Sequence, residues 1–455
     1  MNLAIFDDKR WTDLMDPVAD NAAAIIIKNG GLEAMGNALD LLSNEPPDKS
    51  WPDGLRGFID QARVPDGVDQ ARINVAQEWF TTWSAIGTAT LYCASLPETY
   101  CLPGIAQLLL ISHQLTDHAT RRIRMTGQML FDVMTPGGIT GSSLALRSLR
   151  RTRLMHAALR WMRLNPAVNG PLQALVWTDR FGQPINQLEL VYTLMTFSHV
   201  VLRSADRLGI VPDRDKSEAY IDAWNVAGRV LGVDPLLLPE TRAEAELVFD
   251  RIKATHAGPI EGTPLLITAL VASWRRQFAT HHWPLAEVLI HSLFNTLLTP
   301  ATREMLGITP PPHTQEEVSR VLMPVLEAGV RISDEVFRLL PPTAQLAAAV
   351  NHFFAVRETD SAKDDSLYNS AKHMRAWSDQ VRTLKADEVG SMSSRHPVGS
   401  LSVGSASIAT VGFGALLADN GVVCGLRPAT YVEKPEGVPG SGRLLPVVPD
   451  RERDV

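Results

Sequence analysis

One histidine, His156, lies between two arginines at helical spacing. Arg153 precedes it by three residues and Arg160 follows it by four, and residues three and four apart share a face of an α-helix. An imidazole flanked by two fixed positive charges suits the binding of a metal or cofactor that also carries negative charge. Haem, with one iron and two propionates, fits that description, with His156 as the candidate iron ligand.

The stretch that must position this histidine, residues 142–164, is predicted to be one long helix. Its apolar residues do not form a single stripe, so the helix is expected to contact protein on more than one side. From spacing and charge alone, a simpler interpretation is favoured: a packed histidine on a helix with a solvated, or less often phosphate-binding, basic face. That face would consist of Arg147, Arg150, Arg151, Arg153, Arg160 and Arg163.

Composition limits the classes of protein to consider. The chain has 455 residues, of which 45% are apolar, enough for a large core in one big domain or two smaller ones. The formal net charge of −7 argues against nucleic-acid binding by bulk attraction. Three cysteines and the absence of a CxxC or CxxCH motif argue against a disulfide framework, a cysteine-rich zinc site and covalent c-type haem.

The sequence gives no sign of export or of a membrane span. The first residues, MNLAIFDDKRWTDLMD, include acidic side chains and no apolar run of signal-peptide length. Residues 397–418 form a long stretch without charge, but its glycines and serines make it a poor transmembrane segment. We therefore expect a cytoplasmic protein, and membrane association is not indicated.

Helical patterns dominate the chain. Almost no period-two alternation occurs before residue 390, which predicts an all-α, multi-helix fold. Stop and cap signals such as Asn29-Gly30-Gly31, Pro103, Asn186 and Gly209 set the helix ends. Helices are predicted at 13–43 (interrupted at Gly30), 68–91, 103–115, 117–135, 142–164, 187–208, 217–231, 242–257, 264–278, 284–297, 314–339 and 344–356.

Five segments, in this order, resemble those of one known family. They are SLPETY at 95–100, RRIRMTGQ at 121–128, RLMHAALR at 153–160, GQPINQLEL at 182–190 and WNVAGRVLGVDPLLLP at 224–239. Together they resemble the latex-clearing protein and MpaB-type oxygenase family, a group of all-α proteins that bind b-type haem. The resemblance covers about a third of the chain.

The resemblance implies a role for five residues. His156 matches the proximal axial ligand of the haem iron, and Arg153 and Arg160 match arginines near the haem. Arg122 and Thr126 match distal-pocket positions, where they could stabilise and hydrogen-bond bound dioxygen. The residue chemistry leaves simpler roles open, since Arg122 could be a surface charge and Thr126 could bond to its own helix.

One departure from the family concerns the substrate. Rubber-cleaving members carry a lysine directly before the distal threonine, and this chain has Met125 there. The resemblance implies a haem-b-dependent oxygenase that uses dioxygen on an apolar, unsaturated, isoprenoid-like substrate, by oxidative cleavage of a carbon–carbon double bond. Met125 puts polyisoprene itself in doubt. The alternative is a haem-binding or gas-sensing protein of the same fold that does not catalyse a reaction.

The domain boundaries follow from the resemblance and from composition. Residues 1–67 are predicted to be an N-terminal helical extension, residues 68–356 the haem-binding, oxygenase-like helical domain, and residues 357–455 a flexible, partly disordered tail. The other histidines have weaker patterns: His199 is predicted to be core, and HHWPLAEVLIH at 281–291 lacks HExxH spacing. His113 and His118, near the expected distal helix, could support that side of the site.

Overall fold

The computed structural model of the chain describes residues 1–44, 51–111, 119–139, 144–165, 177, 179–276, 285–309 and 320. The chain divides into two units, Met1–Gly421 and Val422–Val455, and every described residue belongs to the first. The helices predicted at 314–339 (apart from Arg320) and 344–356, and the tail at 357–455, lie outside the described residues.

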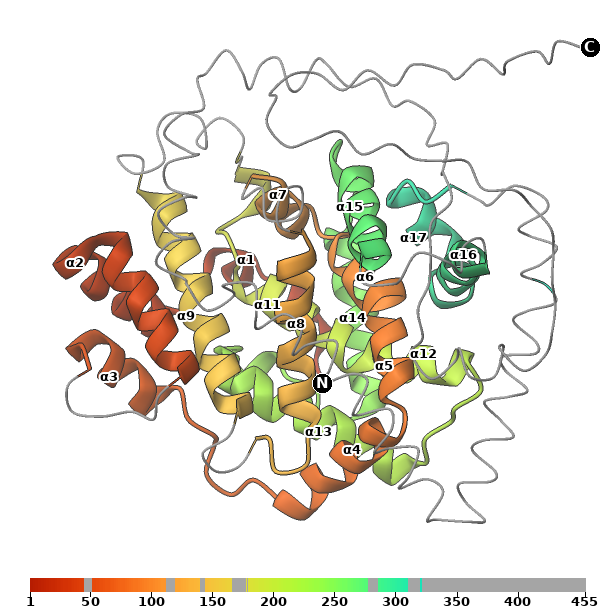
Figure 1. Cartoon of the computed structure of the whole chain (residues 1–455), viewed down its shortest axis with the longest axis horizontal. Coiled ribbons are helices and arrows are strands. Elements are labelled where there is room, and N and C mark those ends of the chain that lie inside the picture. The colour runs from red at the N-terminus through yellow and green to blue at the C-terminus, as the bar shows by residue number, and fades with distance from the viewer. Residues whose placement is uncertain are drawn as a thin grey trace, which may run out of the picture. The chain divides into compact units, whose positions relative to one another are not determined.

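The described residues form helices and connecting segments without any β-strand (Figure 1), which confirms the all-α prediction. In chain order the elements are η1 (Leu3–Asp7), α1 (Arg10–Asp13), α2 (Pro17–Asn44), α3 (Asp53–Gln61), α4 (Gln70–Thr82), α5 (Ser84–Thr90), the π-helical η2 (Leu91–Ser95), α6 (Leu96–Thr99), α7 (Pro103–Ile111), α8 (Ala119–Met134), α9 (Leu144–Leu164), η3 (Asp179–Phe181), α11 (Gln187–Phe197), α12 (His199–Arg207), α13 (Arg214–Leu231), η4 (Pro235–Leu237), α14 (Arg242–His256), α15 (Thr263–Arg276), α16 (Leu285–Leu297) and α17 (Pro300–Met305).

Local cap chemistry accounts for several of these helix ends. The Asn186 side chain accepts a hydrogen bond from the backbone N–H of Glu189 and so caps α11, as predicted. Gly232 ends α13 in the left-handed region, with φ of 89°. Gly30 and Gly31 have non-helical backbone angles inside α2, which confirms the predicted interruption there.

Two predicted helices are divided in the structure. The predicted helix 187–208 breaks at Ser198, whose hydroxyl donates to the carbonyl of Leu194 and competes with regular helix geometry. The predicted helix 68–91 breaks at Trp83 into α4 and α5. The chain then continues through η2 into α6, so most of SLPETY is helical. The short helix α3 was not predicted.

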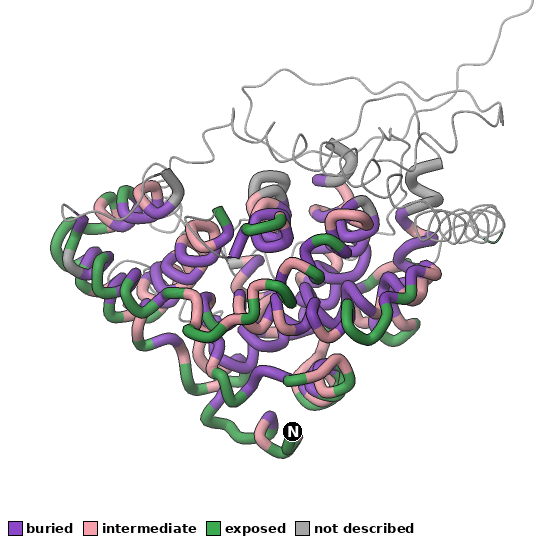
Figure 2. Tube along the Cα trace, turned by 90° about the horizontal axis from the view of Figure 1, so that it is seen from below, coloured by how far each residue is buried: buried purple, intermediate pink, exposed green. Residues whose placement is uncertain are grey.

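Helix α9 lies between other helices, as its lack of a single apolar stripe predicted. One side packs on α2 and α3 in a cluster to which it contributes Leu154, Ala157, Ala158 and Met162. Other sides contact α8 and α13. In Figure 2, buried residues line the inner turns of the described helices, and exposed residues lie on their outer turns. None of the described helices has the length and apolarity needed to cross a bilayer.

Candidate functional site

His156 lies on the side of α9 that faces away from the N-terminal helices. At about 100° per residue, it points roughly opposite to Ala158, which packs in the cluster with α2 and α3. The imidazole is half-buried. The packing of α2 and α3 therefore leaves the His156 side of α9 for the other helices of the fold.

The contact between α8 and α9 leads us to expect the predicted distal residues at the level of His156. The Ser148 hydroxyl of α9 donates to the carboxylate of Asp132 near the end of α8, which sets the register between neighbouring helices (Figure 1). His156 lies eight residues, about 12 Å, beyond Ser148. Eight residues before Asp132 lies position 124, inside the turn that carries Arg122 and Thr126. The Arg122 side chain lies outside the described residues, and Thr126 and Met125 are half-buried.

Arg153 is buried, and each of its three guanidinium nitrogens donates a hydrogen bond within the protein. Its Nε and Nη2 donate to the two carboxylate oxygens of Asp16, at 2.6 and 2.9 Å, and its Nη1 donates to the carbonyl of Val230 at 3.0 Å. Both side chains of the pair are under 10% exposed. Arg153 therefore holds α9 against the start of α2 and the end of α13, and a role for it beside a cofactor stays a prediction.

Arg160 makes a second contact with the first turn of α2. Its Nε donates to Asp20 at 2.6 Å and its Nη1 to the carbonyl of Ile185 at 3.2 Å. Its Nη2 is buried and has no hydrogen-bond partner among the described residues. Burial raises the pKa of Asp20, although the charge of Arg160 opposes that shift.

The arginines of α9 are not the solvated face that the simpler interpretation assumed. Arg150, Arg153 and Arg160 are all buried, and Arg150 donates to the carbonyls of Ala62 and Ile59 beside α3. Carboxylates and carbonyls accept hydrogen bonds from most of the nitrogens of these guanidinium groups, which offsets the cost of burying their charge. Three of the six arginines of α9 therefore bind the N-terminal segment to this helix.

Asp16 and Asp20 are the residues of this site that the sequence did not indicate. Asp16 followed by Pro17 is a typical helix start, and Asp16 does accept the N–H of Ala19. The cap signal gives no hint of an arginine partner 137 residues away. The pairing became visible only in the folded chain.

Gly232 packs directly on the Asp16–Arg153 pair. A Cβ atom built on Gly232 would lie 2.5 Å from Oδ2 of Asp16 and 2.7 Å from Nε of Arg153. The φ of 89° also disfavours any side chain. Both the backbone angle and the space therefore require glycine here.

We expect Gly232→Ala to cost about 3 kcal/mol or more of unfolding free energy, because the new methyl group must displace a buried ion pair. Gly67→Ala is the matched control: Gly67 has a similar φ of 77° but no atom within 4 Å of its added Cβ. That control should cost only about 1 kcal/mol, the backbone penalty alone. Chemical denaturation measures both, and equal losses would show that crowding at Gly232 is unimportant.

Two of the segments that carry the family resemblance meet beside this pair. The Gln187 amide nitrogen donates to the carbonyls of Met15 at 2.8 Å and Gly232 at 2.9 Å. Its amide oxygen accepts the N–H of Asp234 at 2.8 Å. Segments 182–190 and 224–239 thus join each other and the chain leading into α2, a structural role that fixes the surroundings of α9.

The remaining conspicuous carboxylates have structural roles. Glu98 of SLPETY is buried and pairs with Arg203 at 2.8 Å and Lys253 at 2.5 Å. Glu189 lies at the third position of α11, where N–H groups of Asn186 and Ile185 donate to it in the manner of a capping box. Burial raises the pKa of Glu189 to about 8.

The other described histidines differ from His156 in their surroundings. His199 is buried against the ring of Phe249, as expected for a core residue. Burial, followed by the charge of Arg203, lowers its pKa to about 3. Burial also lowers the pKa of His291. The positions of His113, His118, His281 and His282 lie outside the described residues.

Comparison with known proteins assigns the family. A family model described as "ER-bound oxygenase mpaB/B'/Rubber oxygenase, catalytic domain" matches residues 77–328, more than half of the chain. The chain belongs to this family. It is 25% identical over 275 residues to the rubber oxygenase of Streptomyces sp. (strain K30), an alignment that spans 58% of this chain and 63% of that protein.

The fold agrees with this family. The structure titled "Structure of Latex Clearing Protein LCP in the closed state" superposes with a TM-score of 0.61 at 20% sequence identity, covering 70% of this chain and 84% of that chain. Helices α8 and α9, with His156, lie inside the family-matched region, whereas Asp16 and Asp20 lie before it. Residues before the family-matched region therefore hold helix α9 of that region in position.

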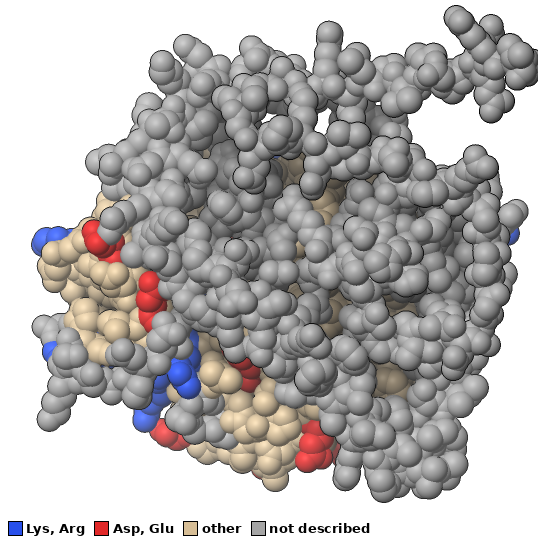
Figure 3. Space-filling model, in the orientation of Figure 1, with Lys and Arg blue, Asp and Glu red and all other residues tan. Residues whose placement is uncertain are grey.

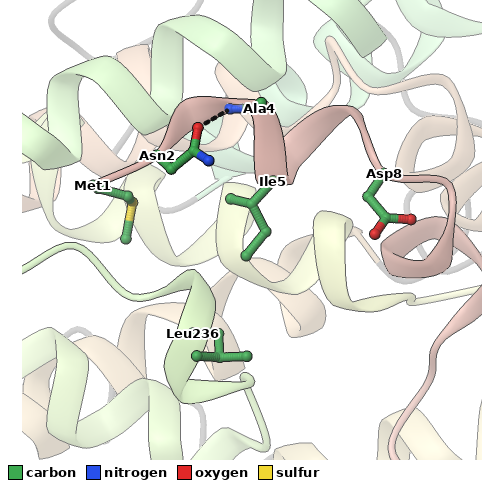
Figure 4. Close-up of a pocket in the computed structure, with 6 residues that line it drawn as sticks. All are labelled: Met1, Asn2, Ala4, Ile5, Asp8 and Leu236. Carbon is green, nitrogen blue, oxygen red and sulfur yellow. Dashed lines mark hydrogen bonds between the residues drawn. The ribbon is translucent and has the colours of Figure 1, made fainter.

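Two surface features lie outside this arrangement of α8 and α9. A pocket of about 400 Å³ is lined by residues of η1 and its flanks with Leu236 of η4 (Figure 4). It contains one titratable side chain, Asp8, and no residue of α8 or α9. On the face shown in Figure 3, acidic and basic atoms of the described residues lie near one another in small groups. Neither feature adds a chemical group to the candidate site.

Proposed function

We propose that this chain is a haem-b-dependent oxygenase that acts with dioxygen on an apolar, unsaturated, isoprenoid-like substrate. The observation that carries the proposal is that the α2–α3 cluster occupies the side of α9 opposite His156, while the Ser148–Asp132 hydrogen bond joins α9 to α8. From this register we expect the α8 turn with Arg122 and Thr126 to lie level with His156. Membership of an oxygenase family supports the same assignment.

The residues present fit a haem group. Among the described residues, no three His, Cys, Asp or Glu side chains cluster as a ligand set for a bare metal ion. A haem iron needs only one protein ligand, since the porphyrin supplies four nitrogens, and His156 can provide it. Nη2 of Arg160, one turn along α9, has no hydrogen-bond partner among the described residues and offers a buried donor to an anionic group.

When bound, the haem would supply the site that binds and activates dioxygen. His156 would hold the iron through a neutral imidazole nitrogen. Thr126, on the helix opposite, would donate its hydroxyl proton as a hydrogen bond on the distal side, and Arg122 would place a positive charge there. Asp16 and Asp20 keep α9 in position by pairing with Arg153 and Arg160.

Met125 bears on the substrate. A thioether next to Thr126 gives the distal side an adaptable apolar wall where rubber-cleaving relatives carry a lysine. Such a wall suits an apolar, unsaturated substrate. The proposed reaction is oxidative cleavage of a carbon–carbon double bond to carbonyl products. The resemblance of this chain to a rubber oxygenase supports an oxygenase reaction on an unsaturated substrate.

The absorption spectrum and oxygen uptake test this function together. Protein expressed with supplied haem should show a Soret band, and short apolar alkenes in air should increase its oxygen consumption. Absence of a Soret band would refute haem binding. A Soret band without substrate-dependent uptake would favour the second candidate, a gas-sensing or haem-binding protein, which the loss of a charged group at Met125 supports.

A further inference from the structure

Arg163, in the last turn of α9, carries a charge that no described residue neutralises. It makes no ion pair among the described residues, and its buried Nε has no hydrogen-bond partner there. Its guanidinium carbon lies 5.6 Å from the centre of the Trp177 ring. Burial lowers the pKa of Arg163, and no carboxylate offsets that effect.

The position of Arg163 on α9 relates it to His156. Seven residues separate them, which places the two side chains within about 20° on the helix and about 10 Å apart along it. Arg160 lies between them, about 40° from His156. Two unsatisfied N–H groups, Nη2 of Arg160 and Nε of Arg163, therefore lie on the His156 side of the helix, toward its C-terminal end.

Arg153 offers a contrast on the other side of His156. Each of its three guanidinium nitrogens donates one hydrogen bond, two to Asp16 and one to the carbonyl of Val230. A buried guanidinium donor left without a partner is costly, whereas one that meets an anion gains a charge-assisted hydrogen bond. Among the described residues, Arg160 and Arg163, on the C-terminal side of His156, each have a buried nitrogen without a hydrogen-bond partner, whereas Arg153 has none.

We propose that Arg163, together with Nη2 of Arg160, binds a carboxylate of the haem, and that Arg153 does not. This inference rests on the proposed function, because it requires haem at His156. It adds a binding residue, Arg163, and assigns Arg153 to positioning α9. The cation–π contact of Arg163 with Trp177 would help to hold the guanidinium in place for the carboxylate.

Haemin and haemin dimethyl ester together test the proposal, because the ester keeps the porphyrin and iron but lacks both carboxylates. The full-length protein, stripped of haem, would be titrated with each compound and followed at the Soret band. Arg163→Gln should weaken haemin binding about tenfold, the typical loss for one charge-assisted hydrogen bond. The affinity for the ester should be unchanged, because the ester has no carboxylate for Arg163 to bind.

Two further variants complete the design. Arg163→Lys keeps the charge and should lie between the wild type and Arg163→Gln in haemin affinity. Arg180→Gln is the matched control, because Arg180 also lies over an aromatic ring, that of Phe181, but is exposed and outside α9. It should leave the affinity for both compounds unchanged.

Each outcome separates this inference from the proposed function. If Arg163→Gln weakens the binding of haemin and of the ester equally, Arg163 acts only on the fold. If haemin binding is unchanged, Arg163 is not part of the site. Either result overturns this inference and leaves the proposed function untouched. If Arg163→Gln does not fold, Arg163→Lys is used in its place. A ratio of haemin to ester affinity equal to that of the wild type would then overturn the inference. Wild-type protein that binds neither compound would refute the proposed function itself.

Discussion

His156→Ala should abolish stable haem binding, lowering affinity by at least on the order of 100-fold, because the iron loses the one protein ligand that we assign to it. Even the partners that merely orient a metal ligand change affinity by about 10- to 100-fold when lost. The measurement is the Soret absorbance per protein after purification with supplied haem. Added imidazole should restore the band in part, because it can fill the space left by the missing ring.

His199→Gln is the control for this experiment. His199 also lies on a helix, but it is buried and packs on Phe249 in the core. The variant should keep its haem. Full haem occupancy in His156→Ala would show that the iron ligand lies elsewhere, and loss of haem in the control alone would point to His199.

Asp16→Ala should lower the free energy of unfolding by about 3–5 kcal/mol. The substitution leaves the guanidinium of Arg153 buried without its carboxylate, and an uncompensated buried charge carries a penalty of that size. It also removes the acceptor for the first turn of α2. Chemical denaturation followed by circular dichroism measures the loss.

Two comparisons make that result specific. Asp7→Ala removes another N-terminal aspartate–arginine pair, the one with Arg251, whose exposed side chains should make the denaturation midpoint almost insensitive to the change. Asp16→Ala combined with Arg153→Met should recover much of the lost stability, because no buried charge remains. A double variant as unstable as the single one would show that the cost comes from helix capping rather than from the ion pair.

The sequence predicted the parts of the fold that depend on local chemistry. Asn186 as a cap and the interruption at Gly30 follow from residue type and neighbours, and the structure confirms them. The break at Ser198 was missed, because a serine within a helical pattern bonds back to its own helix as readily as it points outward. Hydrophobic periodicity does not report such competition.

The sequence predicted the helices that carry the candidate site, but it did not predict which side chains pair with one another there. The spacing of Arg153 and Arg160 around His156 indicated a shared helix face, but not that Asp16 and Asp20 neutralise both arginines. Those partners come from 137 and 140 positions away, and nothing in α2 marks them out. Arg163, which belonged to the same basic cluster, has no such partner among the described residues and carries the new proposal.

The attachment of α2 to α9 has a consequence for where this protein can be cut. The family-matched region begins at residue 77, yet the Leu154–Met162 side of α9 is covered by α2 and α3 from upstream of it. A fragment trimmed to residues 77–328 would expose this apolar surface and would remove hydrogen-bond acceptors from three guanidinium groups, those of Arg150, Arg153 and Arg160. We expect such a fragment to aggregate in solution, so a truncated protein should keep the residues before position 77.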